Sequence, residues 1–167
     1  EGSDVDAVVV ATAGGVWWAR LFCLSLLSLA RRRPGQGSAA PKICLSFFVD
    51  EAHFDVRELR MGEHDIDFAC WVANFYPFYD AENCYQRFWA ANYPWLLSAL
   101  PNVRHVVPHP ARLIRHAPLF RRALEALLAP FSAFARAIQQ KKFPPAIKEL
   151  ANRDTRVRVQ EGVLKFH

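Results

Sequence analysis

The stretch YQRFWAANYPWLLSALPNVRHVVPHP, from Tyr85 to Pro110, carries the pattern on which the predicted fold depends. Its apolar residues recur at steps of three and four, which is typical of one face of an amphipathic helix. Pro94 lies inside this pattern and predicts a kink, at a cost of roughly 3 kcal/mol. Asp80 is expected to cap the helix through the amide of Asn83. Val103 to Val107 is short and β-branched, and it is predicted to be a strand.

Further strands and helices are predicted on both sides of this stretch. KICLSFFVD (Lys42 to Asp50) and IDFACWVANF (Ile66 to Phe75) are apolar runs that favour strands. Leu119 to Ile138 is predicted to be a second amphipathic helix that Pro130 kinks or divides. Ala146 to Asn152 is expected to add one or two helical turns.

The tail TRVRVQEGVLKF predicts a hairpin, because Val157, Val159, Leu164 and Phe166 alternate on either side of Glu161-Gly162. The predicted order of elements indicates an α/β domain with a small mixed sheet.

RRRPGQGSAAP (Arg31 to Pro41) has the composition of a linker. We therefore expect residues 1–41 to be an N-terminal extension and linker. Residues 42–167 are expected to form the α/β domain together with a C-terminal extension.

The extension contains an apolar stretch, Val16 to Ala30, within a region from Ala7 to Val49 that has no acidic residue. An acid-free, basic segment of this kind is typical of organellar targeting. One alternative is a retained helix that packs on a partner, with Trp17, Trp18 and Phe22 as the candidate interface residues. The other is a short membrane anchor, which is not favoured because the stretch is shorter than the ~20 residues that a bilayer requires.

The composition indicates a folded chain. Apolar residues make up 52% of the 167 residues, and the five Trp and thirteen Phe are many for this length. Such residues fill cores and permanent interfaces. Cys23, Cys44, Cys70 and Cys84 are widely spaced, which excludes a zinc ribbon and a dithiol redox motif. Free thiols are expected, and one or two disulfides are the alternative.

Charge is unevenly distributed along the chain, whose formal net charge is +5. Asp50 to Glu82 holds nine acidic and two basic residues, whereas Pro101 to Lys148 holds nine basic residues and one acidic residue. A basic surface dominated by arginine suits contact with phosphates. The alternative explanations are that the two halves face each other within one fold or that both are merely solvated. The candidate RNA-binding residues are Arg31, Arg32, Arg33, Arg104, Arg112, Arg115, Arg121, Arg122, Lys141 and Lys142.

A search for catalytic, metal-binding and cofactor-binding patterns yields none. His64 lies among acidic residues, but one histidine in an acidic turn is more often solvated than a metal ligand. Gly14-Gly15 lacks the phosphate-loop fingerprint and its following lysine. We therefore expect no catalytic residue, no metal and no cofactor, and a chain that is not an enzyme.

The stretch from Tyr85 to Pro110 resembles the thioredoxin-like domain that is shared by mitochondrial ribosomal proteins and a small accessory subunit of respiratory complex I. The resemblance rests on Gln86-Arg87-Phe88 at the start of the helix, Tyr93-Pro94 midway and Leu100-Pro101 at its end. Val103 to Val107 and His109-Pro110 follow in the family's order. The chain departs from the family at its first and last helical positions, where Arg and Asn are usual.

The resemblance implies a thioredoxin-like α/β fold: a small mixed sheet flanked by helices, with the N-terminal apolar extension and the C-terminal hairpin added. It also implies a structural subunit. The basic half of the chain favours the mitochondrial ribosome, and within it the large subunit, with contacts to rRNA and neighbouring proteins. An accessory structural subunit of a mitochondrial respiratory-chain membrane complex is the alternative, and a divergent thioredoxin-like enzyme is a second one. The expected location is the mitochondrial matrix, or the matrix face of the inner membrane.

Overall fold

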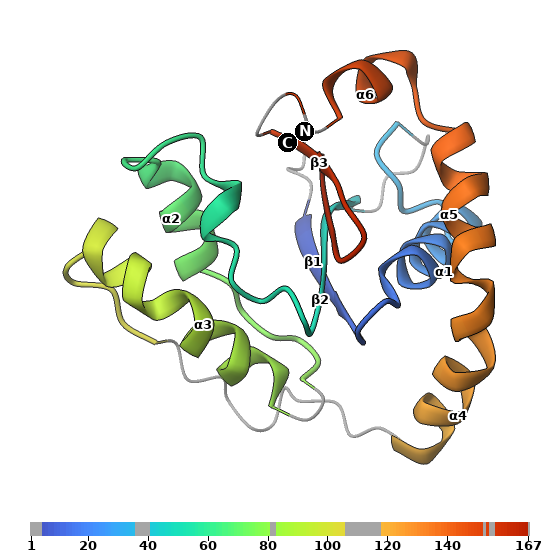
Figure 1. The fold of residues 1–167 in the computed structure, drawn as a ribbon, viewed down its shortest axis with the longest axis horizontal. Coiled ribbons are helices and arrows are strands. Elements are labelled where there is room, and N and C mark those ends of the chain that lie inside the picture. Colours follow the sequence, from blue (N-terminus) through green and yellow to red (C-terminus); the bar gives the residue numbers. More distant parts are fainter. Residues whose placement is uncertain are drawn as a thin grey trace. The chain divides into compact units, whose positions relative to one another are not determined.

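The computed structural model describes residues 5–35, 41–80, 83–105, 118–151, 153 and 156–166 (Figure 1). These residues form a mixed α/β structure with a four-stranded sheet and six α-helices. The chain divides into two compact units. Unit 1 combines Glu1–His53 with Arg122–His167, and unit 2 is Phe54–Arg121.

Unit 1 contains the whole sheet, in the order β1-β2-β4-β3. The first two strands are parallel and the other pairs are antiparallel. The strands are β1 (Val5–Ala11), β2 (Ile43–Asp50), β3 (Val157–Val159) and β4 (Val163–Phe166). The expected strand after Lys42 and the expected C-terminal hairpin are therefore confirmed.

Strand β1 lies within the residues that the sequence predicts to be an N-terminal extension. Its residues pair with β2 in register, Val9 opposite Phe48 and Ala11 opposite Asp50. Helix α1 (Val16–Leu29) connects the two strands. Because β1 and α1 complete the sheet unit, residues 1–41 are not a separate extension. The pairing partner lies about forty residues away, and this is why local sequence patterns missed it.

The core of unit 1 lies between the sheet and two helices that pack on each other, α1 and α5 (Ser132–Lys141). Phe47, Phe48 and Val49 of the central strand β2 are fully buried.

The predicted division at Pro130 is confirmed, since a 3₁₀ turn, Ala129–Phe131, separates α5 from α4 (Pro118–Leu128). The last helix, α6 (Pro145–Leu150), matches the short helix expected before the hairpin.

Unit 2 holds helices α2 (Ile66–Ala73) and α3 (Cys84–Ala99). The strand predicted for Ile66 to Phe75 is wrong. Asp65 caps a helix there, its carboxylate accepting a 3.0 Å hydrogen bond from the Phe68 amide. The buried residues Phe68, Ala69, Val72 and Ala73 follow helical spacing.

The long helix predicted from Tyr85 is confirmed as α3, and Pro94 lies inside it. The expected N-cap at Asp80 is wrong, because the N-cap of α3 is Asn83. The Asp80 carboxylate instead accepts a 3.2 Å hydrogen bond from the Tyr85 amide in the first turn. The strand predicted for Val103 to Val107 is not formed over 103–105, and its last two residues lie outside the described residues.

Candidate functional site

The candidate residues Arg31, Arg32 and Arg33 follow directly after α1 and are held against the start of β2. The Arg32 carbonyl accepts a hydrogen bond of 2.8 Å from the Ile43 amide. The Arg32 guanidinium donates to the Pro41 carbonyl at 3.2 Å. Arg31 and Arg33 are exposed. This arrangement holds the arginine run at the amino ends of the parallel strands.

A second basic segment, Lys141 and Lys142, is exposed at the end of α5. Arg20, on α1, contacts the end of the same helix. Its guanidinium donates to Gln139 Oε1 at 2.7 Å and lies 5.0 Å from the Phe143 ring centroid. Burial, with a smaller contribution from the positive charge of Arg33, lowers the pKa of Arg20 to about 10.

We call these five residues the basic end of unit 1: Arg31, Arg32, Arg33, Lys141 and Lys142. Of the other candidates, Arg104 is exposed in unit 2, while Arg112 and Arg115 lie outside the described residues. Arg121 and Arg122 belong to α4, and their side chains are not described.

The three candidate interface residues on α1 have different environments. Trp17 is 2% exposed and contributes to the core of unit 1, so the expectation that it contacts a partner is corrected. Trp18 is half-buried against the same core. Phe22 is 63% exposed, Leu26 is 49% exposed and Leu29 is 84% exposed. These three residues form one outer face of the helix.

A second exposed apolar face runs along α4 and α5. It consists of Leu124, Leu127, Phe131 and Phe134, which follow helical spacing and are all exposed. Large apolar side chains gathered in this way mark sites of interaction. None of the helices in the described ranges is long and apolar enough to cross a membrane.

The carboxyl ends of β1 and β2 carry a polar cluster that the sequence patterns did not reveal. Asp50 is 2% exposed and its carboxylate accepts three hydrogen bonds. The Gly14 amide donates to Oδ2 at 2.9 Å, while the Ala52 amide and His53 Nδ1 lie 3.1 and 2.6 Å from Oδ1. A carboxylate beside one ring nitrogen fixes the orientation of an imidazole. His53 is thus held at the edge of the sheet where parallel strands usually bind ligands.

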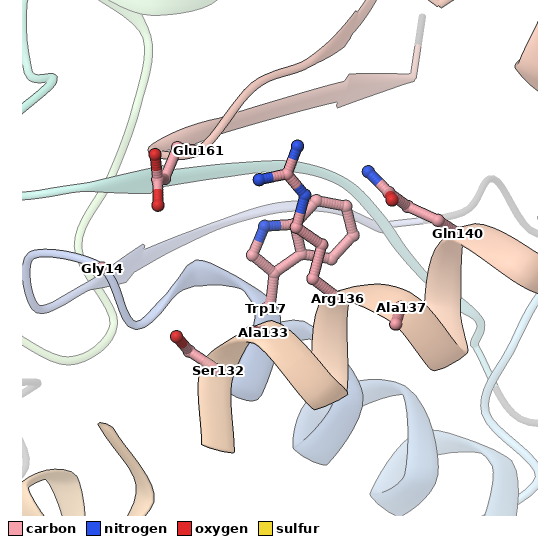
Figure 2. Close-up of a pocket in the computed structure, with 8 residues that line it drawn as sticks. All are labelled: Gly14, Trp17, Ser132, Ala133, Arg136, Ala137, Gln140 and Glu161. Atoms are coloured by element: carbon pink, nitrogen blue, oxygen red, sulfur yellow. The ribbon is translucent and has the colours of Figure 1, made fainter. Parts of the chain in front are cut away.

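A small pocket opens beside this cluster, within unit 1 (Figure 2). Its volume is about 170 Å³, and its lining comes from the start of α1, from α5 and from the turn between β3 and β4. Trp17 Nε1 has no hydrogen-bond partner in the part of the chain that the structure describes, and the Arg136 guanidinium lies 5.9 Å from the Trp17 ring centroid. The pocket therefore combines hydrogen-bond donors from two helices with the carboxylate of Glu161.

The signal that could have revealed this region is the Gly14-Gly15 pair between an apolar strand and a helix. Gly14 has a φ of 75°, a backbone conformation that favours glycine, and it also lines the pocket.

Within the described residues, no group of three or more His, Cys, Asp and Glu residues could hold a metal ion. No protein-family model, no curated protein and no solved structure matches the chain.

Proposed function

We propose that this chain is a structural subunit of a large assembly, with the mitochondrial ribosome as the first choice and its large subunit favoured. In this proposal the protein works in the matrix, without catalytic activity, by bridging rRNA and neighbouring proteins. The observation that carries the proposal is the basic end of unit 1. It comprises the residues that follow α1 and those at the end of α5, two helices that pack on each other.

Three features of the basic end suit an RNA backbone. Arg31, Arg33, Lys141 and Lys142 are exposed. The backbone of the arginine run is fixed by the hydrogen bond between Arg32 and Ile43, so less conformational entropy is lost on binding. Arginine also presents a planar set of donors that matches phosphate oxygens in pairs.

The two exposed apolar faces of unit 1 support contacts with neighbouring proteins. One is Phe22, Leu26 and Leu29 on α1, and the other is the face of α4 and α5. A subunit of a permanent assembly buries such faces against other chains.

We extend the proposal to a thioredoxin-like fold. Its support is helix α3, which spans Cys84–Ala99 with Pro94 inside it, as the resemblance implies. The mixed four-stranded sheet is compatible with it.

A second candidate is an accessory structural subunit of a respiratory-chain membrane complex, at the matrix face of the inner membrane. The observation that favours it is the α1 face, where Leu29 is 84% exposed and no charged residue stands between Leu21 and Ala30. Such a face could pack at the edge of a membrane complex through its apolar side chains.

Fractionation of mitochondria that contain the tagged full-length chain separates the two candidates. The first predicts that the chain sediments with ribosomal particles at low salt and is released as the salt concentration rises. The second predicts migration with a detergent-solubilised membrane complex, unchanged by salt. A chain that remains unassociated in both fractionations would contradict both candidates.

A further inference from the structure

The indole N–H of Trp17 is a buried hydrogen-bond donor that has no partner among the described residues. The residue is 2% exposed, and its carbonyl accepts a 2.6 Å bond from Gln139. Figure 2 shows the nitrogen on the edge of the ring that is turned toward Glu161, across the pocket. Because leaving such a donor unpaired is costly, an acceptor supplied by a bound molecule would stabilise this arrangement.

Two further features make the same side of the pocket attractive to an anionic oxygen. The Arg136 guanidinium lies over the Trp17 ring and lines the pocket. The amino end of α1, whose N-cap is Gly15, has no side-chain cap and no acidic residue in its first turn. Its amides therefore carry a partial positive charge, which the Asp50 carboxylate offsets in part through the neighbouring Gly14 amide.

The opposite side of the pocket requires a donor from the ligand. The carboxylate of Glu161, in the turn between β3 and β4, can only accept hydrogen bonds when it is ionised. A simple anion would be repelled by it. The volume of about 170 Å³ is below the ~300 Å³ of the smallest typical ligand pockets, which suits a small molecule.

We infer that unit 1 binds a small organic acid that also carries a hydroxyl or ammonium group, such as an α-amino or α-hydroxy acid. Its carboxylate accepts from Trp17 Nε1 and Arg136, and its hydroxyl or ammonium group donates to Glu161. Arg136 lies over the indole, so its side chain must turn aside as the acid enters. The inference is independent of the proposed function, because the pocket and the basic end share no residue.

The indole N–H resonances of the protein provide a direct test. The chain has five tryptophans, and the Trp17 resonance is identified by its loss in Trp17→Phe. Titration of the full chain with L-serine at constant ionic strength should shift this resonance saturably, in the millimolar range. Acetate and glycerol, which each supply only half of the recognition, should bind more weakly.

Three variants complete the test. Arg136→Gln should weaken L-serine binding about tenfold, because a charge-assisted hydrogen bond is lost. Lys142→Gln, which removes a positive charge elsewhere, should leave it unchanged. Glu161→Gln should weaken L-serine binding more than acetate binding. The inference is overturned if the Trp17 resonance does not shift saturably, if Arg136→Gln binds as well as the wild type, or if acetate binds as tightly as L-serine.

Discussion

The Gly14 amide donates a 2.9 Å hydrogen bond to the buried carboxylate of Asp50, which fastens the turn after β1 to the end of β2. Asp50→Ala should lower the free energy of unfolding by about 3 kcal/mol, because the amides of Gly14 and Ala52 lose a charged acceptor. Urea unfolding followed by tryptophan fluorescence measures this loss. The exposed Glu161→Gln is the control and should change stability by less than about 0.5 kcal/mol. Equal stability of the two variants would contradict the role of Asp50.

Gly162 is a glycine because His53 lies against it. A Cβ at this position would overlap the His53 ring, including Nδ1 and Cγ. Gly162→Ala should therefore displace His53 from Asp50 and lower stability by about 1 to 2 kcal/mol.

A double-mutant cycle checks this explanation. In a His53→Ala background the added methyl group no longer meets a ring, so Gly162→Ala should then have almost no effect. If the cost of Gly162→Ala were the same in both backgrounds, the contact with His53 would not be its cause.

The strands and helices with strong local patterns were predictable from the sequence. The hairpin around Gly162 and the helix from Tyr85 each follow a clear period, and the run before Asp50 is a short, continuous apolar stretch. The sequence of α2 favours a strand because its apolar run is short and contains aromatic and β-branched residues. Asp65, immediately before it, is the local signal of a helix start.

The candidate site was less predictable, because its residues come from segments that are distant in sequence. Asp50 and His53 are three residues apart, but Gly14 and Glu161 join them only through the sheet. The basic end similarly depends on the packing of α1 against α5, in which Arg20 contacts Gln139 and Phe143. The charge imbalance along the chain predicted the basic residues but not their arrangement.

Asn92 should be essential to unit 2. It is fully buried, and its Oδ1 accepts from the Val56 amide at 3.0 Å and from Trp95 Nε1 at 2.9 Å. Its Nδ2 donates to the Phe54 carbonyl at 2.6 Å. Asn92→Leu leaves these buried groups unpaired and should cost about 3 kcal/mol in urea unfolding.

The matched control for this prediction is Asn74→Leu, at the exposed end of α2, where one hydrogen bond to the Cys70 carbonyl is lost. That change should cost about 1 kcal/mol or less. An Asn92→Leu protein as stable as the control would show that the buried network contributes little to unit 2.

The thiols of Cys23 and Cys70 should react at different rates. Burial raises the pKa of Cys23, which lowers its thiolate fraction at pH 8, whereas Cys70 is exposed. Labelling with iodoacetamide, followed by mass spectrometry of peptides, should modify Cys23 at least about tenfold more slowly than Cys70. In denaturant the two rates should converge. Equal rates in the folded protein would contradict the burial of Cys23.

The most direct test of the proposed function is the salt dependence of binding to mitochondrial ribosomal particles. The variant replaces Arg31, Arg33, Lys141 and Lys142 by Gln, and a control replaces Arg57 and Arg60 of unit 2 by Gln. If the four cations contact phosphates, the slope of log K against log salt should fall in magnitude by about 3 in the variant and stay unchanged in the control. An unchanged slope in the variant, or no binding by the wild-type chain at low salt, would contradict the account.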